Sequence, residues 1–249
     1  MKKLYEKREL TFALVWIGVY CVLQSLANPL NARLGIAYSA SAAFCAVQSA
    51  ILFCFLRKNQ LLTRYGLCRS ALPARRFLYY IPLVVLASGN LWNGFSVSAP
   101  LADVLCRIFC MLCVGFLEEV LFRGLLFRAM AKARVRTAVI VSSVTFGIGH
   151  VINLVNGSGM TLADNLLQIV FAIAVGFLFV TVFYRSGSLL PCIFTHAAIN
   201  ILSTFANDAD ISVEKQMLQC AALIAVTILY TTVLTKTLPS ALHAEQKAP

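Results

Sequence analysis

Residues 162–184 read LADNLLQIVFAIAVGFLFVTVFY, and their single charged side chain, Asp164, lies near the start. A run of about 20 apolar residues is the length at which a helix crosses the hydrocarbon core of a bilayer. Several other segments have the same character. With this one, the candidate spans are 11–28, 36–56, 77–92, 101–130, 136–155, 162–184, 188–205 and 213–235. We therefore predict an all-α, polytopic helical bundle with about eight transmembrane helices.

The composition of the whole chain agrees with this prediction. Of its 249 residues, 60% are hydrophobic and only 12% are charged, whereas soluble domains are about 45–50% apolar and about 25% charged. The mean hydropathy is +0.82. These values exclude an ordinary soluble enzyme, a disordered chain, collagen and a coiled coil. Because the sequence has no internal repeat and no convincing linker, we expect one transmembrane domain over residues 1–249.

The basic residues are distributed unevenly between the two sets of loops. Seventeen Lys and Arg residues fall in 1–10, 57–76, 128–136, at Arg185 and after residue 235, whereas the opposite loops hold only Arg33 and Lys215. Lys and Arg accumulate on the cytoplasmic side of membrane proteins. We expect both termini to be cytoplasmic in a multi-pass protein of the bacterial plasma membrane. The net charge of +11 then reflects topology and contact with the lipid bilayer, and no aromatic-interleaved basic patch indicates a nucleic-acid partner.

Ionisable side chains at membrane depth cost about 2.5–3.5 kcal/mol each on insertion scales and indicate a functional site. Residues 115–128 read GFLEEVLFRGLLFR. Glu119 and Arg123 have the i, i+4 spacing of an ion pair, and Glu118 lies about 100° around the helix from Glu119. We therefore expect Glu118 to face another helix or a wet cavity, with Gly115 leaving room for a close approach. Nearer the outer end of the same span, Asp103 and Arg107 are expected to pair with each other.

Two further spans carry polar residues at a similar depth. Residues 144–153, VTFGIGHVIN, place Phe146 and His150 on one helix face, and residues 187–200, GSLLPCIFTHAAIN, do the same for His196 and Asn200. At 1.5 Å per residue, Glu118, His150 and Asn200 lie about 21–22 Å from the basic inner end of their spans, and His196 about one turn less. This matched depth favours a functional site over isolated polar residues that join helices by hydrogen bonds.

Three kinds of chemistry fit these side chains. A carboxylate shielded from bulk water acts as a general base, a neighbouring imidazole shares the water, and a second imidazole with an amide donates to an oxyanion. These groups suffice for attack of water on a peptide bond. Alternatively, Glu118, His150 and His196 form the two-His, one-carboxylate set of catalytic zinc sites. A proton or ion pathway in a transporter uses similar residues, although no repeated halves with broken helices are present.

Together the three segments resemble the CPBP family of intramembrane endopeptidases, which includes the type II CAAX prenyl proteases, the Abi proteins and bacteriocin-processing or immunity proteins. The family pattern is E-E-x-x-x-R, then F-x-x-x-H, then H-x-x-x-N. Every position of this pattern is filled here, by Glu118, Glu119, Arg123, Phe146, His150, His196 and Asn200. The resemblance covers about 101–205, which is the expected catalytic core, whereas the flanking spans match only in hydrophobic character.

The resemblance implies a helical bundle, commonly of eight spans, with its site in a cavity open to the cytosol. It implies that Glu118 and His150 activate water and that His196 and Asn200 stabilise the oxyanion. Glu119 and Arg123 then support the site or touch the substrate. The implied function is an intramembrane protease that cleaves a membrane-embedded, amphipathic or lipidated peptide or protein. We expect no cofactor, with zinc at Glu118, His150 and His196 as the alternative, and a non-catalytic peptide-binding or bacteriocin-immunity protein as the alternative function.

Overall fold

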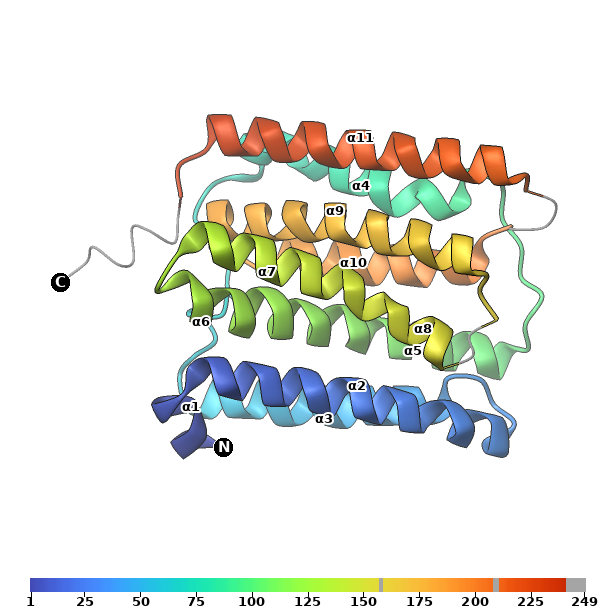
Figure 1. Cartoon of the computed structure of the whole chain (residues 1–249), viewed down its shortest axis with the longest axis horizontal. Coiled ribbons are helices and arrows are strands. Elements are labelled where there is room, and N and C mark those ends of the chain that lie inside the picture. Colours follow the sequence, from blue (N-terminus) through green and yellow to red (C-terminus); the bar gives the residue numbers. More distant parts are fainter. Residues whose placement is uncertain (157–158, 208–210, 241–249) are drawn as a thin grey trace.

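The computed structural model describes residues 1–156, 159–207 and 211–240, and these ranges contain helices but no strand (Figure 1). One isolated β-bridge joins Phe95 to Ala206. In chain order the elements are α1 (Lys2–Lys7), α2 (Glu9–Leu34), α3 (Ser39–Lys58), the 3-10 helix η1 (Ala74–Tyr80), α4 (Ile81–Ser88), η2 (Gly89–Leu91), α5 (Leu101–Glu118), the π-helix η3 (Glu119–Phe127), α6 (Arg128–Ala131), α7 (Val135–Ile148), η4 (Gly149–Val151), α8 (Ile152–Val155), α9 (Leu162–Ser186), α10 (Leu190–Leu202), η5 (Ser203–Phe205) and α11 (Val213–Thr237).

Five helices within the described residues are long and apolar enough to cross a membrane: Glu9–Leu34, Ser39–Lys58, Val135–Val155, Leu162–Ser186 and Val213–Thr237. They correspond to five of the expected spans, so the prediction of an all-α polytopic membrane bundle is confirmed. The chain is an integral membrane protein. The total number of crossings and the cytoplasmic placement of both termini stay predictions.

The three remaining expected spans differ from one another. Residues 101–131 form one continuous helical rod, because α5, η3 and α6 follow one another without a break. Residues 190–205 form a shorter apolar helix. The expected span 77–92 is corrected: its only α-helix is α4, eight residues long, because Leu78, Tyr79 and Tyr80 take left-handed backbone conformations with φ of 51° to 60°. Such residues interrupt a right-handed helix, and eight residues are too few to cross a bilayer.

The long helices lie side by side in pairs (Figure 1). Helices α2 and α3 form one edge, α5 and α7 come next, α9 and α10 lie beyond them, and α4 with α11 forms the opposite edge. Helix α10 touches α5 on one side and α4 on the other. Contact between α5 and α10 requires Gly115, because a Cβ there would lie 2.9 Å from the backbone nitrogen of Ala197. This close approach, expected for Gly115 from the sequence, brings the neighbouring residue His196 next to the two glutamates.

The basic segments gather at one end of the bundle. Arg185 donates to the carbonyls of Thr235 and Leu238, and Arg76 donates to the carbonyl of Thr237. At the same end lie α1, α6 and the C-terminal end of α11 (Figure 1). The helices therefore place the Lys- and Arg-rich segments together, as the distribution of charge along the sequence predicts.

Glu9 joins three of these segments at the start of α2. Its carboxylate accepts two hydrogen bonds of 3.0 Å from Arg64 and one from the hydroxyl of Tyr65, and it contacts Lys132 at the end of α6. The side chain of Glu9 is only 11% exposed. Burial and the hydrogen bond to Glu9 raise the pKa of Tyr65, so this hydroxyl stays protonated and remains a donor. The junction ties α2 to the 59–73 loop and to the rod that carries the glutamates.

We expect Glu9→Gln to lower the thermal stability of the purified protein. The neutral amide keeps the shape of the side chain but removes the counter-charge of Arg64 and Lys132, and hydrogen bonds to charged groups contribute about 1.5–3 kcal/mol each. Thermal unfolding in detergent measures the effect. Glu6→Gln, at an exposed carboxylate in α1, is the matched control and should leave the unfolding midpoint unchanged. Equal midpoints for the two variants would contradict a structural role of the junction.

Candidate active site

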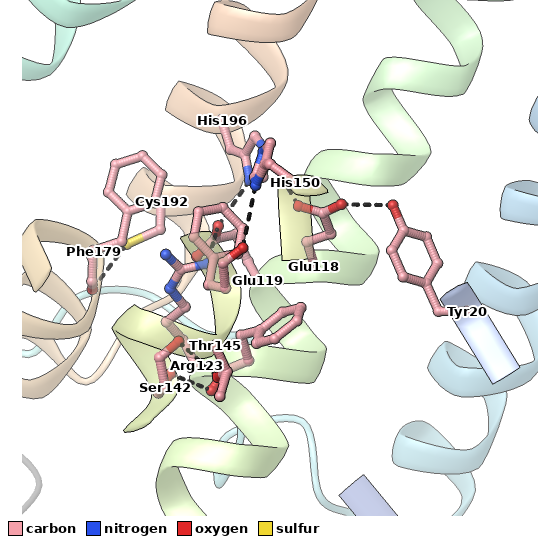
Figure 2. A network of polar contacts seen from close by, with 12 residues as sticks. Tyr20, Glu118, Glu119, Arg123, Ser142, Thr145, His150, Phe179, Cys192 and His196 are labelled. Carbon is pink, nitrogen blue, oxygen red and sulfur yellow. Dashed lines mark hydrogen bonds and ion pairs between the residues drawn. The ribbon is translucent and has the colours of Figure 1, made fainter. Parts of the chain in front are cut away.

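Except for Asn200, the polar residues expected at membrane depth come together between four helices. Figure 2 shows Glu118 and Glu119 at the junction of α5 and η3, His196 from α10, and His150 from the segment after α7, with Tyr20 reaching in from α2. The ring of Phe146 contacts both imidazoles, with centroid separations of 5.3 Å to His150 and 5.7 Å to His196. Three segments far apart in the sequence therefore form one site, as their matched depth predicts.

Glu119 and Arg123 form the ion pair expected from their spacing. Their charged atoms are 3.0 Å apart, and both side chains are fully buried. Glu119 also accepts a 2.8 Å hydrogen bond from Nδ1 of His196. The guanidinium lies over the ring of Phe146 at 3.9 Å and near that of Phe179 at 5.5 Å, so aromatic faces supply part of its surroundings. Because Glu119 and Arg123 neutralise each other inside the protein, we interpret Glu119 as a group that positions His196.

The pair is nevertheless incompletely hydrogen-bonded. Within the described parts of the chain, Oε2 of Glu119 and the Nε and Nη2 atoms of Arg123 are buried and have no hydrogen-bond partner. Buried charges are costly unless they are paired. Each residue of the pair therefore needs the opposite charge of the other to offset the cost of its burial.

Glu118 has a different environment from its neighbour. Its Oε1 accepts a 2.6 Å hydrogen bond from the hydroxyl of Tyr20, and its Oε2 lies 3.7 Å from Nε2 of His196. The side chain is 14% exposed, whereas that of Glu119 is fully buried. The prediction that Glu118 faces another helix is confirmed by the contact with α2. Of the two carboxylates, Glu118 is the one that water can reach.

The backbone around His150 fixes the protonation of its ring. Nδ1 lies 3.2 Å from the carbonyl oxygen of Phe146. Since a carbonyl only accepts, a hydrogen bond here places the proton on Nδ1 and leaves Nε2 as the acceptor nitrogen of the neutral ring. The carbonyl of His150 in turn accepts a 2.9 Å bond from Asn165 of α9, whose side chain is fully buried. The imidazole is therefore held in the tautomer that takes up a proton at Nε2.

A change of helix type separates the two glutamates. Helix α5 ends at Glu118, and the π-helix η3 begins at Glu119. A π-helix has i→i+5 hydrogen bonds and a wider turn, and it occurs frequently at functional sites. The hydroxyl of Ser142 on α7 donates to the carbonyl of Phe122 within this segment at 2.8 Å. The wide turn is thus bound to α7, the helix that leads to His150.

Asn200 is the one predicted site residue that the described contacts do not join to the cluster. It lies one turn after His196 on α10, and the hydrogen bond recorded for it is to its backbone carbonyl, from Ser203 at 2.7 Å. Its role toward an oxyanion stays a prediction. The expected pair of Asp103 and Arg107 is wrong: Asp103 accepts from the backbone N–H of Ala37, and Arg107 donates to Ser203.

The alternative zinc set does not fit this arrangement. In residues 1–156, 159–207 and 211–240, no group of three or more His, Cys, Asp or Glu side chains is placed to hold a metal ion. The expectation that the protein needs no cofactor stays a prediction.

Sequence reasoning missed Tyr20 and Asn165, although both touch site residues. Each is a polar side chain within an expected span, which is the criterion that identifies the histidines. An uncharged phenol or amide, however, costs less free energy in a membrane than an ionised side chain does. Its presence in a span is therefore a weaker indication of function.

Comparison with known proteins shows a family similarity for the central part of the chain. Residues 100–202 match the family model described as Type II CAAX prenyl endopeptidase Rce1-like. No curated protein and no solved structure matches the chain. The matched residues include both glutamates, Arg123, both site histidines and Asn200, whereas Tyr20 lies outside them. Over residues 100–202, the chain is therefore similar to the Rce1-like type II CAAX prenyl endopeptidase family.

Proposed function

We propose that this protein is an intramembrane endopeptidase in which Glu118 and His150 activate the attacking water. The observation that carries the proposal is the difference in burial and hydrogen bonding between the two carboxylates. Glu119 is fully buried and bonded to Arg123 and His196, while Glu118 is partly exposed and contacts a phenol hydroxyl and a more distant imidazole nitrogen. A general base must be accessible and able to accept a proton, and Glu118 meets both requirements.

The reaction that we propose is direct hydrolysis. Glu118, assisted by the acceptor Nε2 of His150, takes a proton from water while the oxygen of that water bonds to the carbonyl carbon of the substrate. His196 is oriented by Glu119 and, when protonated at both nitrogens, presents Nε2–H to the resulting oxyanion together with the amide of Asn200. The carbon–nitrogen bond then breaks, and the proton held by Glu118 passes to the leaving amine. Water is the nucleophile, so no Ser or Cys is needed.

The substrate is a peptide bond in a membrane-associated protein or peptide. The family supports this coarse class, because CAAX endopeptidases act on membrane-associated chains. A location in the bacterial plasma membrane is a further prediction of the sequence, and a prenylated substrate is one candidate among several.

Comparative proteomics tests the proposal. Cells that carry the wild type or Glu118→Gln at matched abundance are compared for membrane proteins and for secreted and intracellular peptides. A precursor that accumulates only in the variant supports the protease and gives its substrate. Identical profiles, with any phenotype retained by the variant, would instead support the alternative of a peptide-binding or immunity protein.

A second variant tests how Glu118 is held. We expect Tyr20→Phe to lower kcat about 10- to 100-fold with little change in KM. It removes one hydrogen bond to a carboxylate, an interaction of about 1.5–3 kcal/mol, without touching the substrate. Kinetics on the precursor identified above measure the change.

Tyr230→Phe is the matched control for this variant. Tyr230 is also buried and donates a 2.7 Å bond to the carbonyl of Phe77, away from the site. We expect Tyr230→Phe to lose about as much thermal stability as Tyr20→Phe does while its kcat stays unchanged. If both variants lose activity in proportion to stability, Tyr20 has only a structural role.

A further inference from the structure

A cavity of about 700 Å³ lies between α4 and α10. Leu83, Val84 and Ala87 line it from α4, and Pro191, Phe194 and Ala198 line it from α10. Val84 and Phe194 are 66% and 69% exposed, so the cavity opens sideways toward the surface that contacts lipid. None of its lining residues belongs to the catalytic cluster.

Helix α10 separates this cavity from the candidate active site. Pro191, Phe194 and Ala198 recur at spacings of three and four residues, and so occupy one face of the helix. His196 is five residues after Pro191, which places it about 140° around the helix axis. It faces Glu118 and Glu119 on α5 and η3, whereas the cavity faces α4. A molecule bound in the cavity therefore lies behind the catalytic helix.

The wall of the cavity is apolar along its length and cationic at one end. The hydroxyls of Ser70, Ser88 and Ser188 are already bonded to backbone carbonyls, at 2.7, 2.8 and 2.6 Å. Among the described lining residues, Arg69 is the only one with a charge, and it is exposed. An occupant of matching chemistry has a hydrocarbon body and an anionic end.

The length of the cavity corresponds to one leaflet of a bilayer. Its lining on α10 runs from Leu190 to Leu202, which is about 18 Å along a helix axis. Half of a hydrocarbon core of about 30 Å is about 15 Å. Arg69 belongs to the basic segment 57–76, which we expect on the cytoplasmic side, where anionic lipids attract Lys and Arg.

We propose that this cavity binds an anionic phospholipid of the inner leaflet, with one acyl chain between α4 and α10 and its phosphate against Arg69. A lipid attached to a peptide substrate is the less suitable occupant, because a tail bound here leaves the scissile bond across α10 from Glu118. The site is independent of the proposed reaction, since none of its residues takes part in catalysis.

Native mass spectrometry of the full chain, released from nanodiscs of equal parts phosphatidylglycerol and phosphatidylcholine, tests the proposal. We expect the wild type to retain one phosphatidylglycerol in preference to phosphatidylcholine. Arg69→Gln should reduce that preference about five-fold, since one basic residue near an anionic surface contributes about this much, and Arg69→Lys should retain it. Val84→Trp, which fills the cavity from an exposed position, should remove the bound lipid.

Arg57→Gln provides the matched control, because Arg57 is exposed on the same expected side of the membrane but does not line the cavity. It should behave as the wild type. Equal phosphatidylglycerol retention by the wild type and Arg69→Gln would overturn the proposal, as would unchanged retention by Val84→Trp. A farnesylated peptide that displaces the lipid, while phosphatidylglycerol fails to compete in return, would assign the cavity to a substrate tail instead.

Discussion

Glu118→Gln is expected to lower kcat by about 10²–10⁴-fold, the range that general acid–base catalysis contributes. The amide has the size of the carboxylate, and its oxygen still accepts the hydrogen bond from Tyr20. It cannot take a proton from water. The variant should therefore reach wild-type abundance and thermal stability while losing turnover, as measured on the precursor that accumulates in cells carrying it.

The same substitution at a carboxylate outside the site is the control. Glu6→Gln, in α1 at an exposed position, should retain wild-type turnover. If Glu118→Gln were as active as this control, Glu118 would not be the general base, and the partial exposure that distinguishes it from Glu119 would have another cause.

Glu119→Ala is expected to have the largest effect on stability. It removes the counter-charge from Arg123, which is fully buried and whose Nε and Nη2 atoms have no hydrogen-bond partner in the described chain. Breaking a buried ion pair by removing one partner costs about 3–5 kcal/mol. It also removes the acceptor that orients His196. Expression level, thermal unfolding and turnover should all fall together, in contrast to the selective loss of turnover in Glu118→Gln.

An exposed ion pair with identical spacing provides the comparison. Lys2 and Glu6 are also i, i+4 neighbours, 3.8 Å apart and more than half exposed. Such surface pairs contribute little, so Glu6→Ala should leave stability unchanged. The double variant Glu119→Leu/Arg123→Leu should recover much of the stability lost in Glu119→Ala, because no charge remains unpaired, but none of the activity. Normal stability of Glu119→Ala would show that the ion pair does not support the fold.

Local geometry makes the centre of this site predictable. The i, i+4 spacing of Glu119 and Arg123 and the angle between neighbouring residues on a helix separate the two glutamates before any tertiary contact is known. Depth along each span then brings Glu118, His150 and Asn200 to one level, with His196 about one turn nearer the inner end. Gly115 can likewise be expected at a close helix contact, because it precedes the glutamates on their own helix. These features depend on helical periodicity alone, and the structure confirms the Glu119–Arg123 pair and the close contact at Gly115.

Features that depend on packing between distant segments are not predictable in the same way. Tyr20 meets Glu118 across 98 residues of sequence, and helical spacing carries no information on that contact. Asp103 and Arg107 have the spacing of an ion pair, but Ala37 and Ser203 supply competing partners. The apolar composition of 77–92 indicates a span, whereas the left-handed turn at residues 78–80 shortens its helix. In each case tertiary structure overrides a local preference.

Because Tyr20 lies in α2, outside residues 100–202, the candidate active site is assembled from two parts of the chain. Residues 100–202 carry the recognisable motifs, whereas α2 carries none of them. A related chain can keep both glutamates, both histidines, the arginine and the asparagine and still lose the phenol that holds the first glutamate. Exchange of the N-terminal helical hairpin between relatives would change this contact while leaving every motif residue in place. The position of Glu118 thus depends on the packing of α2 against the rod formed by α5 and η3, which the motif residues by themselves do not reveal.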